Sequence, residues 1–560
     1  MAKIFKEFND EKWEEVRHHP YYAKYRENAI KMAEKNMETE PPVLKFSMIH
    51  RYAVDGNREE FEAVHTEYFA RMRNFFAAYM LTLDEKYITP LADIIWNICD
   101  FESWSIPAHV AENLPISERR SNLDLCSTIA GFELSEVLYF IGDKLPELVV
   151  RRAKAELRYR IIDSYARATP KRYWWLQAKN NWSAVCIAAV LGTYLYAAEK
   201  EEIDEQLPRM VESANCYLEG FADDGCCGEG YAYWNYGFSY FCMFAALLNE
   251  YTDGKINFFE NPKVAKIARF QESIPLNEKQ CVSFSDCGLE FNPASWLSHF
   301  LKGVYPDLRI PAISAVTGGG AAARHILWQN PDMCVSSLDA TEPVSFSFPD
   351  AQWFIYRCQG YALGCKAGHN NEQHNHNDVG SFLISKGRGV TFCDPGVGQY
   401  TKQYFSPTRY ELMLCSSRGH SVPIINGQLQ DTIDDKATIY THENNRYKFS
   451  MEKVYRVDTL RTLTRDFVCA EDGVILTDTY EFSEAPSSVV ERFVSLQPIT
   501  EKDGRIICAD TVLCYDASSF DISFGSEEVE RKQGKVGTVY YVDLAVKAPK
   551  KNMELTFKFI

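Results

Sequence analysis

The sequence GHNNEQHNHNDVGSF, residues 368–382, lies shortly after a helical pattern gives way to a β pattern. The helical half of the chain precedes it, and most of the β half follows it. Three of the chain's twelve histidines, at positions 369, 374 and 376, fall within eight residues here. Alternate side chains of a strand point to one face, so His374, His376 and Asp378 are expected to share a face. Burying so polar a run in a β-rich domain is costly, which favours a functional site over a polar sheet edge.

Upstream of this stretch the sequence is helical to about residue 325. Phe69, Met72, Phe76 and Tyr79 recur at spacings of three and four, as one buried helix face requires. Similar patterns recur at about 124–165, 183–198, 205–221 and 233–251. Long helices joined by short loops form antiparallel hairpins, and enough of them in succession curl into a toroid. We therefore predict a toroid of helical hairpins over residues 1–325.

From about residue 340 a period of two replaces the helical pattern. Apolar residues alternate with polar ones over 447–451 and again over 555–559. Asp-Gly pairs at 472–473 and 503–504 are hairpin turn signals, and the three glycines at 318–320 indicate a linker. Residues 326–560 are therefore predicted to form an antiparallel β-sandwich.

Composition excludes several classes of function. A net charge of −17 argues against a nucleic-acid partner, which requires a basic surface. The N-terminus MAKIFKEFNDEKWEEV lacks an apolar segment, and the longest apolar run, Ala184 to Ala198, is too short to span a bilayer. Seventeen scattered cysteines without repeated CxxC pairs indicate reduced thiols. We expect a cytoplasmic protein without a membrane partner, and its 14% aromatic content suits sugar stacking.

One candidate constellation is a metal site in the second half of the chain. His376, Asp394 and His420 supply two imidazoles and a carboxylate from three segments that a sheet can bring together. This ligand set is adequate for zinc. The alternative is that the three are hydrogen-bonded polar residues at the edge of the sandwich.

Two further candidate stretches lie in the helical half. Residues 228–237 carry Tyr231, Tyr233 and Tyr236 at the start of a helix, where a tyrosine can act as an acid or a base or can simply pack. In the same stretch Glu229 can orient a tyrosine or cap the helix. Residues 179–183 precede another helix, and Asn180 there suits an N-cap.

His109 and Asp286 are polar residues in apolar surroundings. For both of them a structural role is the favoured interpretation.

Together these motifs resemble the heparinase II/III family of polysaccharide lyases. The resemblance spans roughly residues 60–560 and rests on Asn-Asn-Trp, Glu-Gly-x-x-Tyr-Trp-x-Tyr-Gly, His-x-His-x-Asp-x-Gly-Ser-Phe, Asp-x-Gly and Arg-Gly-His, in that order. It implies an incomplete α/α toroid followed by an antiparallel β-sandwich, with the active site between them. It also implies that Asn181 neutralises a uronate carboxylate and that Tyr233 and His374 are catalytic. His376, Asp394 and His420 would hold a structural zinc ion. These roles aim His376 into the sandwich and His374 toward the cleft, so they require a twist or bulge near Asn375, whereas strict alternation would aim both histidines the same way.

The expected reaction is β-elimination in an anionic, uronate-containing oligosaccharide or polysaccharide, which leaves a 4,5-unsaturated uronate. Tyr236 is the second choice for the catalytic tyrosine, and Trp182 stands where some relatives have a histidine. The residues expected to contact the substrate are Asn180, Trp182, Glu229, Tyr236 and Arg418, of which Arg418 has a surface position as its alternative.

Three other functions stay open at this point. A cupin-like metal-dependent oxygenase or isomerase also uses His-x-His in a β-sandwich, although the expected glutamate after the second histidine is missing. A glycoside hydrolase with an α/α toroid would need paired carboxylates, for which Glu229 and Asp224 are candidates. A carbohydrate-binding protein without catalysis is the third. The sequence assigns no oligomeric state, and a homodimer is one alternative.

Overall fold

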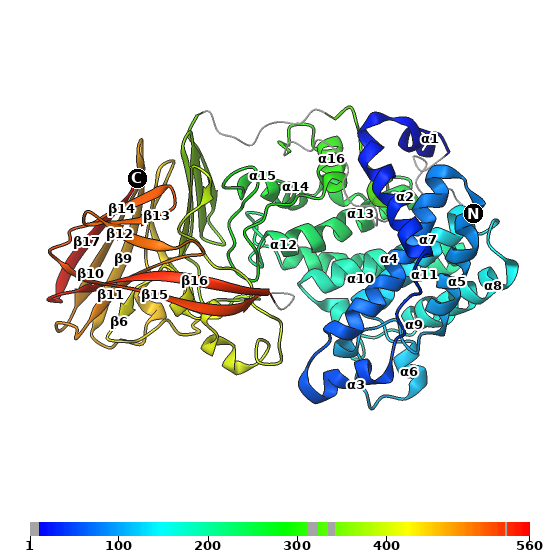
Figure 1. Cartoon of the computed structure of the whole chain (residues 1–560), viewed down its shortest axis with the longest axis horizontal. Coiled ribbons are helices and arrows are strands. Elements are labelled where there is room, and N and C mark those ends of the chain that lie inside the picture. The colour runs from blue at the N-terminus through cyan, green and yellow to red at the C-terminus, as the bar shows by residue number, and fades with distance from the viewer. Residues whose placement is uncertain (1–9, 311–322, 334–341, 532–534) are drawn as a thin grey trace.

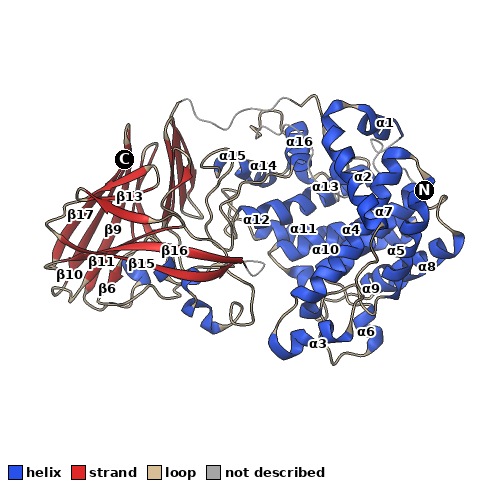
Figure 2. Ribbon diagram, viewed as in Figure 1, coloured by secondary structure: helices blue, strands red, loops and turns tan. Residues whose placement is uncertain are grey.

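The computed structural model describes residues 10–310, 323–333, 342–531 and 535–560. A helical body and a β body lie side by side along the long axis of the molecule (Figures 1 and 2). The glycine linker predicted at 318–320 lies outside the described residues. The boundary predicted at 325 falls inside the last helix, Ala323–Leu327, and the first strand begins at Val344.

The helical body is a toroid of mostly antiparallel hairpins, as the helical periodicity predicts. Its helices are α1 (Asp10–His18), α2 (Ala23–Met37), α3 (Phe46–Asp55), α4 (Glu59–Thr82), α5 (Ile88–Asp100), α6 (Ile116–Arg120), α7 (Leu125–Ile141), α8 (Glu147–Leu157), α9 (Asp163–Ala166), α10 (Asn181–Ala197), α11 (Lys200–Glu219), α12 (Tyr231–Tyr233), α13 (Ser239–Tyr251), α14 (Pro262–Ala268), α15 (Phe270–Ser273), α16 (Ser295–Val304) and α17 (Ala323–Leu327). The predicted stripe of Phe69, Met72, Phe76 and Tyr79 is buried along α4, which confirms it.

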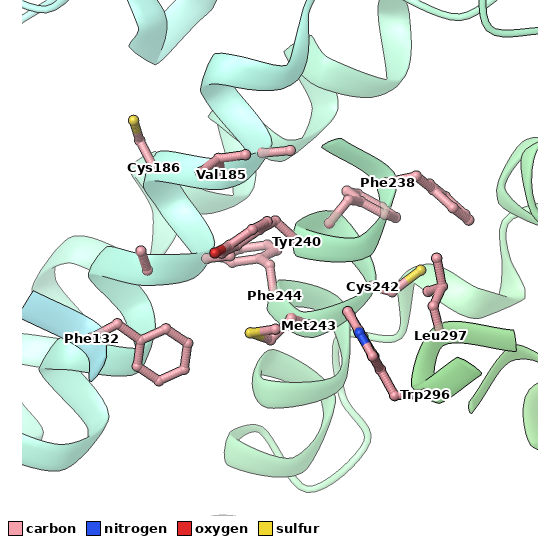
Figure 3. Packing of buried hydrophobic residues seen from close by; sticks show 14 of the residues in the cluster. Phe132, Val185, Cys186, Phe238, Tyr240, Cys242, Met243, Phe244, Trp296 and Leu297 are labelled. Atoms are coloured by element: carbon pink, nitrogen blue, oxygen red, sulfur yellow. The ribbon is translucent and has the colours of Figure 1, made fainter. Parts of the chain in front are cut away.

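Helix α10 forms the centre of the helical core. All residues from Ser183 to Tyr196 are buried, which explains why this segment is apolar on every side instead of on one face. Figure 3 shows Val185 and Cys186 of α10 near Tyr240 and Phe244 of α13. Gly192 allows α7 to approach, because a Cβ atom there would lie 2.2 Å from the ring of Phe132.

The β body contains three antiparallel sheets. The first has the order β1 (Val344–Phe348), β2 (Trp353–Cys358), β3 (Tyr361–Lys366), β4 (Phe382–Lys386) and β5 (Gly389–Val390). The second has the order β12 (Ile499–Lys502), β13 (Arg505–Cys508), β14 (Thr511–Cys514), β17 (Asn552–Phe559), β10 (Gly473–Phe482), β9 (Leu460–Ala470), β8 (Arg446–Ser450) and β7 (Thr438–Glu443). The third has the order β15 (Phe520–Arg531), β16 (Lys535–Val546), β11 (Val489–Ser495) and β6 (Ile424–Ile425).

The predicted hairpin turns are present. Asp503 and Gly504 both have positive φ angles, 53° and 71°, between β12 and β13. That is the backbone of a type I′ turn, in which asparagine, aspartate and glycine are favoured. Glu471 and Asp472 join β9 to β10, and Gly473 of the predicted Asp-Gly pair is the first residue of β10, opposite Ala470.

The five-stranded sheet is shared between two cores. Trp353 and Ile355 of β2 point into the core of the helical body, whereas Phe354 and Tyr356 point into the core of the sandwich. Arg357 continues the first face and donates hydrogen bonds to the backbone carbonyls of the segment 272–275. Because alternate residues of one strand serve the two bodies, this sheet fixes one body against the other.

Two global properties follow from the described residues. No helix among them is long and apolar enough to cross a membrane. The cysteines among them are all free thiols.

Candidate active site

Asn181 and Tyr233 are brought together where two helices meet at a glycine. Asn181 is the first residue of α10, and Tyr233 ends the short helix α12 on the side of the helical body that faces the strands (Figure 1). The next five residues, 234–238, form a π-helical turn, a feature often found at functional sites. Within this turn a Cβ atom on Gly237 would lie 2.9 Å from the Cβ atom of Asn181. Glycine is therefore what allows this approach.

Both side chains line a pocket of about 390 Å³, here called the central pocket. Its walls come from the helical body on one side and from residues 350–351, 369–373 and 436 on the other. The central pocket is thus built by both bodies, as the family resemblance implies. Asn181 is only 6% exposed, so its amide is presented from a fixed position.

Tyr233, which lines this pocket, and His374, which is not among its lining residues, face each other. Their rings stack with centroids 4.4 Å apart and an interplanar angle of 29°. The Tyr233 hydroxyl lies 2.8 Å from the hydroxyl of Tyr400. Tyr400 in turn donates a hydrogen bond of 3.2 Å to Asp286 Oδ2. The phenol of Tyr233 therefore has a defined orientation above the imidazole.

The carboxylate of Asp286 lies at the centre of the site. Its Oδ2 accepts from His374 Nδ1 at 2.6 Å, and its Oδ1 accepts from His376 Nε2 at 3.1 Å and from Arg409 Nη2 at 2.8 Å. The hydroxyl of Tyr404 also donates to Oδ1. A structural role was expected for Asp286. The structure adds a second role, because this residue links most of the candidate catalytic side chains.

Electrostatics keep this carboxylate ionised. Burial by itself would raise the pKa of Asp286, but hydrogen bonds from His374 and His376 and the charge of Arg409 hold it well below its usual range. Burial raises the pKa of Tyr233 above its ordinary value, and the hydrogen bond with Tyr400 only partly opposes this. Tyr233 is therefore a neutral phenol at physiological pH.

The backbone around His374 differs from the strand that alternation predicts. Residues 367–381 form an irregular loop between β3 and β4, and His374 has a left-handed φ of 55°. Its side chain is 21% exposed, whereas that of His376 is fully buried. Strict alternation therefore does not hold here, and the backbone departs from a strand at His374, beside the twist or bulge expected near Asn375. The left-handed residue lets the two histidines reach opposite oxygens of Asp286.

His376, Asp394 and His420 form a buried cluster that could hold a metal ion. One ligand atom from each lies within 4.8 Å of the others, and all three residues are fully buried. Among the described residues, His376 Nδ1, His420 Nδ1 and Asp394 Oδ2 have no hydrogen-bond partner, although His420 Nδ1 and Asp394 Oδ2 lie 3.2 Å apart. Three unsatisfied atoms at one buried point fit a cation.

The second ring nitrogen of each histidine in this cluster is already engaged. His376 Nε2 donates to Asp286, and His420 Nε2 donates to the carbonyl oxygen of Leu414 at 3.1 Å. These bonds place the lone pairs on the Nδ1 atoms, the usual way in which protein metal sites orient histidine ligands. His376 thereby connects the metal-ligand cluster to Asp286 and, through it, to His374.

The other predicted contact residues lie in different places. Asn180 caps α10 by accepting from the amide of Trp182 at 3.2 Å, and its Nδ2 lies 3.4 Å from Gln373 Oε1 across the central pocket. Glu229 lines the same pocket, and burial raises the pKa of its carboxyl group. Tyr236 packs edge-on against Tyr240 and is not among the residues that line the central pocket.

Trp182 and His109 line a second pocket of about 580 Å³, here called the tryptophan pocket. Their ring centroids lie 4.6 Å apart, and His109 Nδ1 lies 2.8 Å from Asp124 Oδ2. Asn181 and Trp182 are consecutive residues, so the two pockets adjoin along α10.

Arg418 does not line either pocket. It lies 3.7 Å from Glu527 and donates to the backbone of Glu411. The arginine that reaches the site is Arg409. Sequence reasoning missed Arg409, Tyr400 and Tyr404, which no motif distinguishes from the other arginines and tyrosines of the chain.

The helical toroid, the sandwich and the pocket between them define the fold class of the heparinase-like polysaccharide lyases. Heparinase III has a TM-score of 0.62 to this chain at 12% identity, covering 98% of this chain and 91% of that one. Heparan sulfate lyase HepC from Pedobacter heparinus gives 0.57 at 12% identity, covering 98% and 92%. Chondroitin AC lyase from Streptomyces coelicolor A3, in complex with chondroitin sulphate, gives 0.56 at 9% identity, covering 98% and 82%. No protein-family model and no curated protein sequence matches the chain.

Proposed function

We propose that this chain is a lyase that cleaves a uronate-containing glycan by β-elimination in the central pocket. One observation carries the proposal. His374, held at Nδ1 by Asp286, stacks on Tyr233, and Tyr233 lines the same pocket as the Asn181 amide. These are the three groups that the reaction needs, and they come from three separate segments of the chain.

The first requirement is to make the C5 proton of the uronate acidic. An ionised carboxylate next to C5 opposes the build-up of further negative charge. Hydrogen bonds from the Asn181 amide to that carboxylate stabilise the charge that develops when the proton leaves. Such fixed dipoles act most strongly in a partly buried site, where no reorganisation is needed.

The second requirement is a base and an acid. Since Asp286 accepts from Nδ1 of His374, the Nε2 lone pair of the neutral imidazole is the group that takes the C5 proton. The negative Asp286 then stabilises the imidazolium. Tyr233 stays protonated because burial raises its pKa, so it donates its proton to the leaving O4 as the C4–O4 bond breaks and the C4–C5 double bond forms.

The metal-ligand cluster supports a structural role for zinc. His376, Asp394 and His420 would hold the ion, which would tie together three segments of the β body. Zinc commonly takes this combination of imidazole and carboxylate ligands. His376 links this cluster to the candidate catalytic residues, because it donates a hydrogen bond to Asp286, the same carboxylate that holds His374.

Two alternative functions have less support. For a hydrolase, the carboxylate of Asp224 would have to be available, but it accepts from the backbone amides of Cys226, Asp350 and Ala351. It therefore acts as a cap where the two bodies meet. A cupin-like function would leave the helical wall of the central pocket without a role.

The test is an assay for the product. The protein is incubated with glycosaminoglycans, alginate and pectic oligosaccharides, and the ultraviolet absorbance of a 4,5-unsaturated uronate is followed. Absorbance that appears with cleavage supports the proposal. New reducing ends without this absorbance would favour hydrolysis and refute it.

A further inference from the structure

The walls of the two pockets carry little free positive charge. Four lysine and arginine side chains line them, namely Arg119, Arg172, Lys179 and Lys436, together with the histidines His109 and His369. Five acidic side chains line them as well, namely Glu112, Glu219, Glu229, Asp350 and Glu372. Among the described lining residues, acidic groups therefore slightly outnumber lysines and arginines.

Each of these basic groups already has a partner. Arg119 contacts Glu102, with Nε to Oε1 at 2.9 Å, and its side chain is only 6% exposed. Lys179 lies 3.0 Å from Glu219, on the rim of the central pocket.

The other two basic groups are engaged in the same way. Arg172 lies 3.9 Å from Glu118, and its guanidinium lies 5.3 Å from the ring centre of Tyr173. Lys436 donates to the backbone carbonyl of Asp350 at 3.0 Å. Nearer the reacting groups, Arg409 is paired with Asp286.

Among the described lining residues, a sulfate ester would meet no lysine or arginine that lacks a partner. Recognition of sulfate relies on charge-assisted hydrogen bonds from arginine or lysine. Here a sulfate would compete with Glu219 for Lys179 and with Glu118 for Arg172, and the acidic groups of the walls would repel the ester. The net charge of −17 opposes the approach of a dense polyanion in addition.

The tryptophan pocket instead offers apolar surface. Trp174 is 54% exposed and its ring centroid lies 5.1 Å from that of Trp182. Exposed indole rings suit the apolar faces of sugar rings, while the tips of polar side chains bind hydroxyl groups. A single carboxylate per uronate is the charge that Asn181 can accommodate in the adjoining central pocket.

We infer that the glycan cleaved by this chain is unsulfated, with the uronate carboxylate as its recurring charge. The inference rests on the proposed function and narrows its substrate class. It separates this chain from the chondroitin AC lyase, whose structure contains a sulfated glycan.

The experiment compares matched pairs of substrates. Unsulfated N-acetylheparosan is paired with heparan sulfate, and unsulfated chondroitin with chondroitin 4-sulfate, at physiological ionic strength. We expect kcat/KM to be higher for the unsulfated member of at least one pair by about tenfold or more, since misplaced like charges are strongly unfavourable. Equal or faster cleavage of the sulfated members would overturn the inference and leave the lyase proposal intact.

A binding measurement separates this inference from the proposed function. The Tyr233→Phe variant is titrated calorimetrically with the same pairs. Tighter binding of an unsulfated oligosaccharide supports the inference even if no substrate gives a product, an outcome that would refute the lyase proposal alone. Tighter binding of the sulfated partners would overturn the inference.

A charge variant tests the physical cause. Glu219→Gln removes one acidic wall residue and releases Lys179, so the preference for the unsulfated substrate should shrink severalfold. Glu212→Gln is the matched control, because Glu212 is an exposed acidic residue on the same helix that lines neither pocket. An unchanged preference in Glu219→Gln would show that wall charge does not set the selectivity.

Discussion

Replacing Asp286 by asparagine should abolish most activity and also destabilise the fold. The carboxylate is fully buried and accepts from His374, His376 and Arg409 at 2.6, 3.1 and 2.8 Å. An amide keeps the shape but turns one acceptor into a donor that faces other donors. Loss of the carboxylate that orients a catalytic histidine lowers kcat on the order of 10⁴-fold in a related arrangement. Leaving Arg409 buried without its partner costs about 3–5 kcal/mol.

The two effects are measured separately. Product formation is followed by ultraviolet absorbance at a temperature where circular dichroism shows the variant folded, and the free energy of unfolding comes from urea titration. Asp472→Asn is the control, since Asp472 forms an exposed ion pair with Lys558 and should change neither quantity much. If Asp286→Asn keeps kcat within about tenfold of the wild type, Asp286 does not orient the catalytic base.

The same carboxylate gives a signed pH dependence. The pKa of Asp286 is lower in the folded chain than its ordinary value of about 3.9. Its contribution to stability is therefore complete above that value and is lost as the pH falls below it. Urea titrations of the wild type and Asp286→Asn should converge as the pH falls through this range, and a constant difference between them would contradict the assignment.

Three further outcomes are expected. Tyr233→Phe should remove detectable product while the unfolding midpoint stays near that of the wild type, because only the proton donor is lost; unchanged turnover would move the role to another group. His376→Ala should lose bound zinc by elemental analysis and lower the unfolding midpoint, with the exposed His442→Ala as its control, and a zinc-free wild type would refute the metal proposal. Burial lowers the pKa of His65 to about 4, so its contribution of about 3 kcal/mol to stability is lost as the pH falls from about 6.5 to about 4. In His65→Phe, the free energy of unfolding from urea titration should depend less on pH over this range, whereas substitution of the exposed His50 by Gln should leave that dependence unchanged. The same pH dependence in His65→Phe and in the wild type would contradict the assignment.

The fold was largely predictable because burial imposes a period. The α4 stripe is buried, and the apolar residues that alternate along β8 and β17 are buried as that period requires. The metal-ligand cluster was predictable because its three residue types are chemically distinctive. The sequence could not reveal the role of Asp286, since its partners lie 88 or more residues away and meet it only through the tertiary fold.

Two local features could not be located from the sequence pattern. The split of His374 from His376 requires a break in the strand, but the left-handed backbone at His374 is invisible to a pattern that assumes a strand. Proximity to His420 favoured Arg418, yet Arg418 lies against Glu527, while Arg409 reaches Asp286 from a different turn. Neighbours along the chain are poor guides to side-chain direction in a loop.

The five-stranded sheet has a consequence for engineering. Trp353 and Ile355 face one core, and Phe354 and Tyr356 face the other. Separating the helices from the strands would therefore remove Trp353 and Ile355 from the core of the helical body. Neither half is a portable module, and grafting the β body onto another toroid would require redesigning one whole face of that sheet. Variation among proteins of this fold should accordingly concentrate in the loops that border the central pocket, while the sheet that joins the bodies changes as a coordinated unit.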